Sequence, residues 1–368
     1  MVVPLAARSV AAVVGALLVL TAWSSVIGTL IVPRPVSSML TRAVDWAVDR
    51  AYQLAVGHVH DYKRRDLMLA TQAAAVLLSQ LTAWLGFSFV GFALLLWPLD
   101  PIGVSSAFTN AGSSMFTLGF AGTEGAAPLA VVFISAATGL VIVALQVGYL
   151  PALYAAFNRR ETEVALLNGR GGVPAWGPEL LARTHYALGS GVSTIDTLPE
   201  LYAVWERWAA DVMESHSTYL PLVRFRSPRA LSSWVTALLS VLDSAALMLS
   251  LCPEAAPTVS ARLCLRAGFL CFQQIARTMG LGFPDMPEKS DSISVTYEEF
   301  LDAVERMRKV DFPIERDPSD AWPDFVGWRV NYEQAAFGVA AAVDAVPALW
   351  SGPRRSGMTP IPPIRPPL

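Results

Sequence analysis

The residues of this chain with the clearest potential for chemistry lie at 105–122, between two long apolar runs. This segment has the sequence SSAFTNAGSSMFTLGFAG, which is too short and too polar to cross a bilayer. Residues 105–116 are long enough for about three helical turns, with Ser105 or Ser106 as N-cap. Residues 117–122 place glycines where a positive φ would turn successive carbonyls to the same side. Irregular backbone at membrane depth is tolerated where it lines a water-filled cavity, so the segment predicts a re-entrant loop at a pore.

Residues 113–120, SSMFTLGF, followed by a small residue, resemble the pore helix and the Thr-Val-Gly-Tyr/Phe-Gly filter of potassium channels. The family is the prokaryotic type, with two transmembrane helices and one pore loop per chain. The resemblance implies that four chains close a ring and that filter oxygens replace the hydration shell of the ion. By this resemblance Thr117 gives the innermost site through its hydroxyl and carbonyl, and Leu118, Gly119 and Phe120 give the carbonyls above it.

The expected function is therefore a cation channel that conducts potassium, and not an enzyme. The implied assembly is a homotetramer in the plasma membrane, in contact with lipid and with an unidentified cytoplasmic regulator. No cofactor and no metal site are expected, with K⁺ as the permeant ion only. A net charge of −3 gives no argument for a nucleic-acid partner.

Ala121 departs from the family pattern, which has Gly at this position. An Ala held in left-handed backbone costs about 1–2 kcal/mol. Either the outer end of the filter is distorted, or Gly122 takes the role of that Gly with a shift of one residue. A non-selective cation channel is thus one alternative. The other is a membrane-anchored helical scaffold or sensor, in which residues 105–122 are only a connector.

Three further residues are candidates for roles around the pore. Glu124 follows the loop and would join a ring of carboxylates that raises the cation concentration at the pore mouth; an exposed loop acid is the alternative. Gly139 and Gly148 lie in the next apolar run, where each is a possible gating hinge. Glycines are also common in membrane spans for packing alone.

Composition supports membrane embedding, because 54% of residues are hydrophobic and 15% are charged, against about 25% charged in soluble domains. Three transmembrane helices are predicted, at residues 9–32, 67–97 and 127–157. The basic residues within 34–66 and 158–160 should stay inside the cell. The predicted orientation has the N-terminus outside and the C-terminal part in the cytoplasm.

The predicted fold is an all-α membrane protein in five parts. Residues 1–33 hold the N-terminal transmembrane helix, 34–66 an amphipathic cytoplasmic linker helix, and 67–157 the pore domain. Residues 158–352 predict a helical cytoplasmic domain without phosphate-binding motifs, and the Pro-rich residues 353–368 predict a disordered tail.

A few polar residues in apolar surroundings complete the set of expectations. Residues 230–251 are apolar enough for a fourth span, but Asp243 at their centre is costly in lipid, which favours a buried helix of the cytoplasmic domain. Gln72 and Gln80 are expected to hydrogen-bond between helices. His216 has no nucleophile or ligand pattern around it and is expected to be a satisfied structural histidine.

Overall fold

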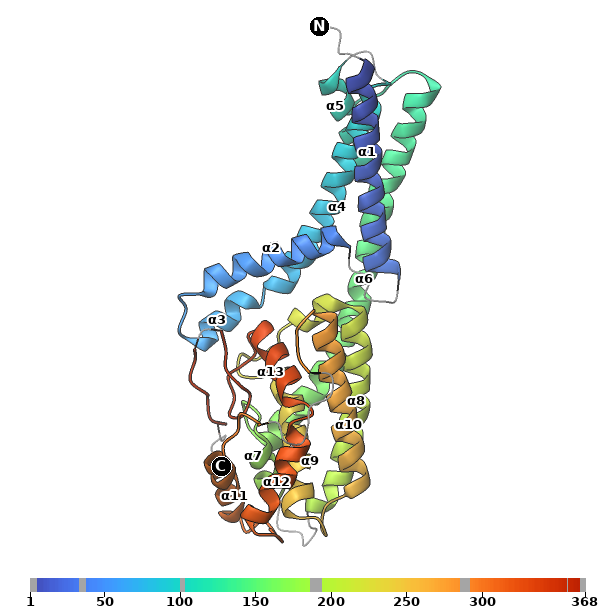
Figure 1. Ribbon diagram of the computed structural model, residues 1–368. Helices are drawn as coiled ribbons and strands as arrows, with labels where there is room; N and C mark the ends of the chain where they lie inside the picture. The colour runs from blue at the N-terminus through green and yellow to red at the C-terminus, as the bar shows by residue number, and fades with distance from the viewer. Residues whose placement is uncertain are drawn as a thin grey trace. The chain divides into compact units, whose positions relative to one another are not determined.

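The structure, a computed structural model, describes residues 5–32, 38–99, 103–185, 194–284, 292–355 and 357–364. Its regular secondary structure is helical, and the strand-like features of these residues are two isolated bridges (Figure 1). The chain divides into two compact units. Unit 1 comprises Met1–Ala55 and Thr71–Tyr154, and unit 2 comprises Val56–Ala70 and Ala155–Leu368.

Unit 1 is a helical bundle in which α1 packs along α4 and α4 packs against α5. Its helices are α1 (Leu5–Val26), continued by the π-helical turn η1 (Ile27–Ile31), α2 (Met39–Val56), α4 (Gln72–Leu96), α5 (Val104–Met115) and the first part of α6 (Ala126–Gly171).

Helices α1 and α4 touch through their backbones at two glycines. A methyl group on Gly15 would stand 2.6 Å from the Gly91 carbonyl oxygen, and one on Gly91 would stand 2.8 Å from the Gly15 carbonyl oxygen. Small residues that let backbones approach this closely are typical of helix association in lipid. The crossing therefore depends on both positions lacking a side chain.

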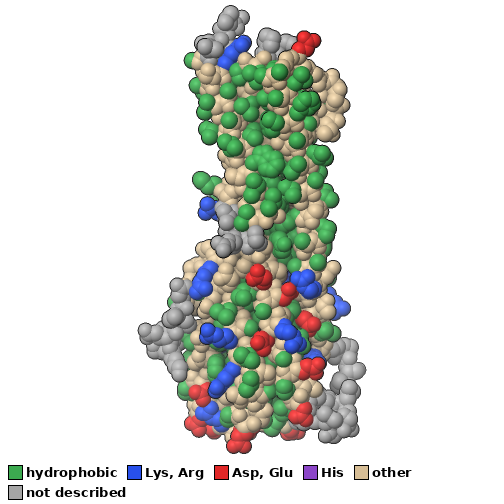
Figure 2. All heavy atoms as spheres, turned by 90° about the vertical axis from the view of Figure 1, so that its right-hand side faces the viewer, with side chains coloured by type: hydrophobic (Ala, Val, Ile, Leu, Met, Phe, Trp, Pro, Cys, Tyr) green, Lys and Arg blue, Asp and Glu red, His purple; other side chains and the backbone are tan. Residues whose placement is uncertain are grey.

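The polarity of unit 1 is the reverse of that in a water-soluble bundle. Its interior contains polar side chains, and its exposed surface carries large apolar ones such as Leu20, Phe133 and Leu140. The buried polar residues are Ser25, Thr41, Asp45, Gln80, Ser88, Asn110, Ser113, Ser135, Thr138 and Gln146. Figure 2 shows the hydrophobic side chains that cover this unit and the charged side chains scattered over unit 2. This distribution is stable where lipid covers the outer surface.

Hydrogen bonds join α2 to α4 inside unit 1. Gln80 Nε2 donates to Asp45 Oδ1 at 2.7 Å, and Gln72 Nε2 donates to Asp49 Oδ1 at 2.8 Å. The prediction that both glutamines bond between helices is confirmed. The carboxylates of α2 thus face a protein partner.

The single linker helix predicted over residues 34–66 is wrong, because the chain there forms α2 and a second helix, α3 (Tyr62–Leu69). Helix α2 ends at Val56, and Asp61 caps α3, since its carboxylate accepts from the Arg64 backbone N–H at 3.1 Å. Helix α6 is also longer than predicted, as it continues past residue 157 to Gly171.

Unit 2 is a helical domain built around α9. After α3 and the end of α6, its helices in chain order are α7 (Gly177–His185), η2 (Thr194–Thr197), α8 (Leu198–Thr218), η3 (Leu220–Arg224), α9 (Trp234–Leu251), α10 (Thr258–Thr278), α11 (Tyr297–Arg308), α12 (Pro318–Arg329) and α13 (Glu333–Ala342). Helices α7, α8, α10, α12 and α13 all pack against α9.

Four helical stretches among the described residues are long and apolar enough to cross a membrane, and α9 differs from the other three in burial. Protein covers 94% of α9 but only 28–33% of the stretches in α1, α3–α4 and α6. Asp243 of α9 accepts hydrogen bonds from Arg329 and, at 2.7 Å, from the Tyr332 hydroxyl. Its charge is therefore paired inside unit 2, where α9 is a buried helix.

The disordered tail predicted at 353–368 is wrong for the residues that the structure describes. Arg354 is buried, and its guanidinium donates to several backbone carbonyls, including that of Ala345. Farther along, the Ile364 N–H donates to the Val173 carbonyl at 2.8 Å. Composition missed this order because a Pro- and Arg-bearing segment can be held by carbonyls that other parts of the chain supply.

A buried histidine lies where α6 enters unit 2. Arg160 Nη1 contacts His216 Nε2 at 2.9 Å, and both side chains are fully buried. Because a guanidinium can only donate, Nε2 is an acceptor and the imidazole is neutral. Burial lowers the pKa of His216 well below its ordinary value of 6.5, and the Arg160 charge lowers it further. The prediction of a satisfied structural histidine is confirmed.

We expect Gly91→Ala to destabilise unit 1 by about 1–3 kcal/mol, since its methyl group would overlap the Gly15 carbonyl. Gly86→Ala is the matched control in the same helix, because nothing lies within 4 Å of its new methyl group. Thermal unfolding in detergent measures both variants. Equal melting temperatures would contradict the close crossing of α1 and α4.

We also expect the stability of unit 2 to fall as the pH drops below about 6.5. The folded pKa of His216 is depressed, so the unfolded chain binds more protons in this range and acid favours unfolding. His216→Gln, which keeps an acceptor for Arg160, should flatten this dependence. His58→Gln, at an exposed histidine, should leave it unchanged in denaturant melts between pH 5 and 8.

Candidate functional site

The candidate site is the segment that leaves the C-terminal end of α5. This helix begins after Gly103, which has φ 114° and serves as N-cap without a side-chain hydrogen bond. The predicted helix is present over nearly the predicted residues, but Ser105 or Ser106 as its N-cap is wrong. Phe108 of α5 packs on Phe89 of α4, with ring centroids 5.5 Å apart.

Ser113, fully buried in the last turn of α5, holds the segment that follows. Its carbonyl accepts from the N–H groups of Leu118 at 2.8 Å and Gly119 at 3.2 Å. Its hydroxyl oxygen accepts from the Ala121 N–H at 2.9 Å. The same hydroxyl donates to the Ala121 carbonyl oxygen at 3.3 Å. One residue thus folds residues 118–121 back over the end of the helix.

The handedness of the backbone alternates at the start of this segment. Thr117 has φ 55° and Gly119 has φ 71°, whereas Leu118 between them is not in the positive-φ region. Such alternation turns neighbouring carbonyls toward one side, and the glycine at 119 permits it without steric cost. The expected positive φ is confirmed at Gly119, and Thr117 adopts it at a cost of about 1–2 kcal/mol.

Ala121 does not adopt the left-handed backbone of the family pattern, and the alternative that Gly122 adopts it after a shift of one residue is wrong. Neither residue has a positive φ. The reason is the pair of hydrogen bonds between Ala121 and the Ser113 hydroxyl, which fixes this residue in a backbone conformation that any side chain tolerates. Ala121 therefore carries no left-handed strain.

One chain does not enclose this segment. Phe116, Thr117, Leu118, Gly119 and Phe120 are all exposed, and the side chains of Leu118 and Phe120 are 61% and 68% exposed. These residues consequently lie at the surface of the chain. Glu124 is exposed as well, at the start of the turn into α6.

The two candidate hinge glycines of α6 have different surroundings. A methyl group on Gly139 would stand 2.1 Å from the Met115 carbonyl oxygen, so α6 touches the end of α5 at this glycine. Nothing lies within 4 Å of a methyl group on Gly148. Helix α6 is continuous through both residues. Gly139 thus has a packing role, and a hinge at either position stays a prediction.

The chemistry that the segment can supply is coordination of a cation by neutral oxygens. Residues 117–122 offer backbone carbonyls and one hydroxyl and have no titratable side chain. Within the described ranges, no three residues of His, Cys, Asp or Glu gather as metal ligands. The role of Ser113 was missed from the sequence. Its signal was a serine in the last turn of the predicted pore helix, four residues before Thr117.

No protein-family model, curated protein or solved structure matches this chain. Its function must therefore be argued from the geometry of the site and the polarity of the two units.

We expect Ser113→Ala to release the outer half of the segment. The change removes the hydroxyl that binds the Ala121 N–H but keeps the carbonyl that binds Leu118 and Gly119. Hydrogen–deuterium exchange should then rise at Ala121 and stay the same at Leu118. Ser114→Ala is the control, since that hydroxyl bonds only the Ala111 carbonyl of its own helix. Equal exchange at Ala121 in both variants would rule out the anchoring role of Ser113.

Proposed function

We propose that this chain is one subunit of a homotetrameric, potassium-conducting cation channel. The observation that carries the proposal is the backbone at residues 117–119, which alternates in handedness, is anchored by Ser113 and lies exposed between apolar helices. Neutral oxygens in this arrangement can replace the hydration shell of an ion when several chains bring them together.

The proposed topology has three membrane spans, in α1, α4 and α6, with α5 as a re-entrant pore helix. Support comes from burial, because these helices expose apolar surface that needs lipid while the surface of α9 is already covered by protein. The basic residues around α2, α3 and the inner part of α6 favour an N-terminus outside the cell and unit 2 in the cytoplasm.

The proposed stoichiometry follows from the incompleteness of the site in one chain. Carbonyls of residues 117–120 on a surface cannot surround an ion, whereas a four-fold ring of them can. In this ring the Thr117 hydroxyl and carbonyl form the innermost site. The carbonyls of Leu118, Gly119 and Phe120 lie above it, Ala121 and Gly122 form the outer end, and Glu124 lies at the mouth.

Ala121 bears on selectivity. Its observed backbone needs no left-handed conformation, so the departure from the family pattern does not by itself strain the outer end. Selectivity then depends on the inner part of the segment, from Thr117 to Phe120. Potassium conduction stays the proposal and a non-selective pore the alternative, and flux of K⁺ against Na⁺ distinguishes the two.

We expect purified protein in liposomes to pass K⁺ faster than Na⁺, and Gly119→Ala to reduce the K⁺ flux about ten-fold or more. An alanine at φ 71° is strained by about 1–2 kcal/mol, so the backbone leaves this conformation and the carbonyls turn away. Gly86→Ala is the matched control, because Gly86 lies in α4 outside the segment and nothing lies within 4 Å of its new methyl group.

Two results would overturn the channel proposal. One is the absence of ion flux from wild-type protein that is correctly inserted. The other is equal flux from the Gly119 and Gly86 variants. A monomer in native-like bilayers, measured by mass photometry in nanodiscs, would likewise contradict the tetramer and favour a membrane-anchored scaffold or sensor.

A further inference from the structure

The chain passes between its two units three times, after Ala55, after Ala70 and after Tyr154. Two of these passages lie at or within a long apolar helix. The one after Ala70 lies just before α4, and the one after Tyr154 lies inside α6. Helix α3 lies in unit 2 and ends two residues before α4 begins, while α6 runs from unit 1 into unit 2 without a break. The contacts that hold α3 and the inner part of α6 within unit 2 therefore restrain the ends of two membrane helices.

Arg160 holds the inner part of α6. Its side chain is fully buried, and its guanidinium donates to the carbonyls of Leu222 at 2.9 Å and Phe225 at 2.8 Å. It also pairs with Glu161 at 2.7 Å. The loop backbone at 222–225 is thus fixed to α6 by a charged donor that water does not reach.

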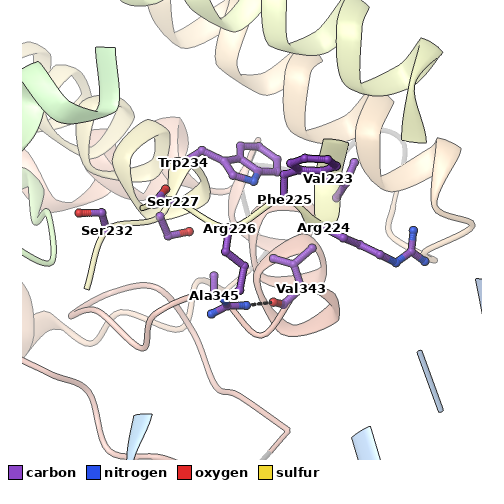
Figure 3. A pocket seen from close by; sticks show the side chains of 10 residues that line it. Val223, Arg224, Phe225, Arg226, Ser227, Ser232, Trp234, Val343 and Ala345 are labelled. Carbon is purple, nitrogen blue, oxygen red and sulfur yellow. Dashed lines mark hydrogen bonds between the residues drawn. The ribbon is translucent and has the colours of Figure 1, made fainter. Parts of the chain in front are cut away.

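Arg226, the next residue of the same loop, holds α3. It forms an ion pair with Asp66 and donates to the Tyr62 hydroxyl at 2.7 Å. The same guanidinium donates to the carbonyls of Val343 at 2.8 Å and Asp344 at 3.0 Å. Figure 3 shows Arg226 between the loop and Val343, beside a cavity of about 20 Å³ that has room for about one water molecule.

Residues 222–226, hereafter the strap, accordingly bind α6 and α3 through adjacent residues. Phe225 gives its carbonyl to α6, and Arg226 gives its side chain to α3. Adjacent residues in a chain cannot separate, so a displacement of one helix pulls on the other through a single peptide unit. Both attachments are charge-assisted hydrogen bonds, which are stronger than neutral ones; Arg160 is fully buried and Arg226 is partly buried.

We propose that the strap couples α3 to α6, so that the inner ends of the second and third membrane helices move together when unit 2 changes. As regulation of a pore this rests on the proposed channel function, but the coupling itself is a property of unit 2. The device makes unit 2 the part through which a cytoplasmic signal reaches both helices at once.

A second contact of α3 supplies the control for this proposal. Arg65 forms an ion pair with Asp344 and donates to the Val56 carbonyl at 2.6 Å. Asp344 also accepts from Arg226 through its carbonyl, but loss of the Arg65 bonds leaves the bonds of Arg226 to Asp66 and Tyr62 in place. Breaking them should loosen α3 alone.

The experiment is hydrogen–deuterium exchange of the full chain in nanodiscs, with peptides that cover α3 and residues 155–171 of α6. Arg226→Gln should raise exchange in both segments about ten-fold, the factor that corresponds to about 1.4 kcal/mol. Asp66→Asn, which removes the partner of Arg226 and leaves the strap intact, should do the same to a smaller degree. Arg65→Gln should raise exchange in α3 only.

Exchange that rises only in α3 for both Arg226→Gln and Asp66→Asn would overturn the coupling, because the disturbance would then stop at the strap. Should Arg65→Gln loosen α6 equally, the effect is general destabilisation and the proposal also fails. Ion flux distinguishes the two proposals. Coupled exchange in protein without flux refutes the channel alone, and flux unchanged by Arg226→Gln refutes regulation through the strap.

Discussion

A single buried serine supplies the hydrogen bonds on which the exposed segment after α5 depends. The end of a helix and the segment after it contain backbone groups that have no partner within the helix. Ser113 satisfies three of the N–H groups that follow, two through its carbonyl and one through its hydroxyl. The end of α5 is in turn held where α6 lacks a side chain, at Gly139. The conformation of the loop is therefore set largely by the helix before it, which explains why an alanine is accepted at 121.

Both units contain long apolar helices, but the two units differ in what covers the apolar side chains of these helices. In unit 1 the polar groups turn inward and pair between helices, as Gln80 does with Asp45, and the apolar surface is left for lipid. In unit 2 the apolar surface of α9 is covered by five other helices, and its one acid pairs with Arg329. Length and mean hydropathy cannot tell these cases apart, because they count apolar residues without asking what covers them.

Features that depend on nearby residues were predictable from the sequence, and features that depend on distant ones were not. The helix before the loop, the positive φ at Gly119 and the bonding of Gln72 and Gln80 follow from local pattern and from the cost of unpaired polar groups in lipid. The break between α2 and α3, the order in the tail around Arg354 and the ion pair between Asp66 and Arg226 do not. That pair joins residues 160 positions apart, and no periodicity in either segment indicates its partner.

The buried acid of α9 also has a consequence during synthesis, before the whole chain has been made. Arg329, which neutralises Asp243, stands 86 positions later in the chain, so α9 leaves the ribosome well before its partner exists. During that interval α9 is an apolar helix of 18 residues whose acid has no Arg329 to pair with. A carboxylate at its centre raises the free energy of insertion by about 2.5–3.5 kcal/mol. The charge of Asp243 thus disfavours placing α9 in a bilayer, and in the finished domain Arg329 and Tyr332 pair with it.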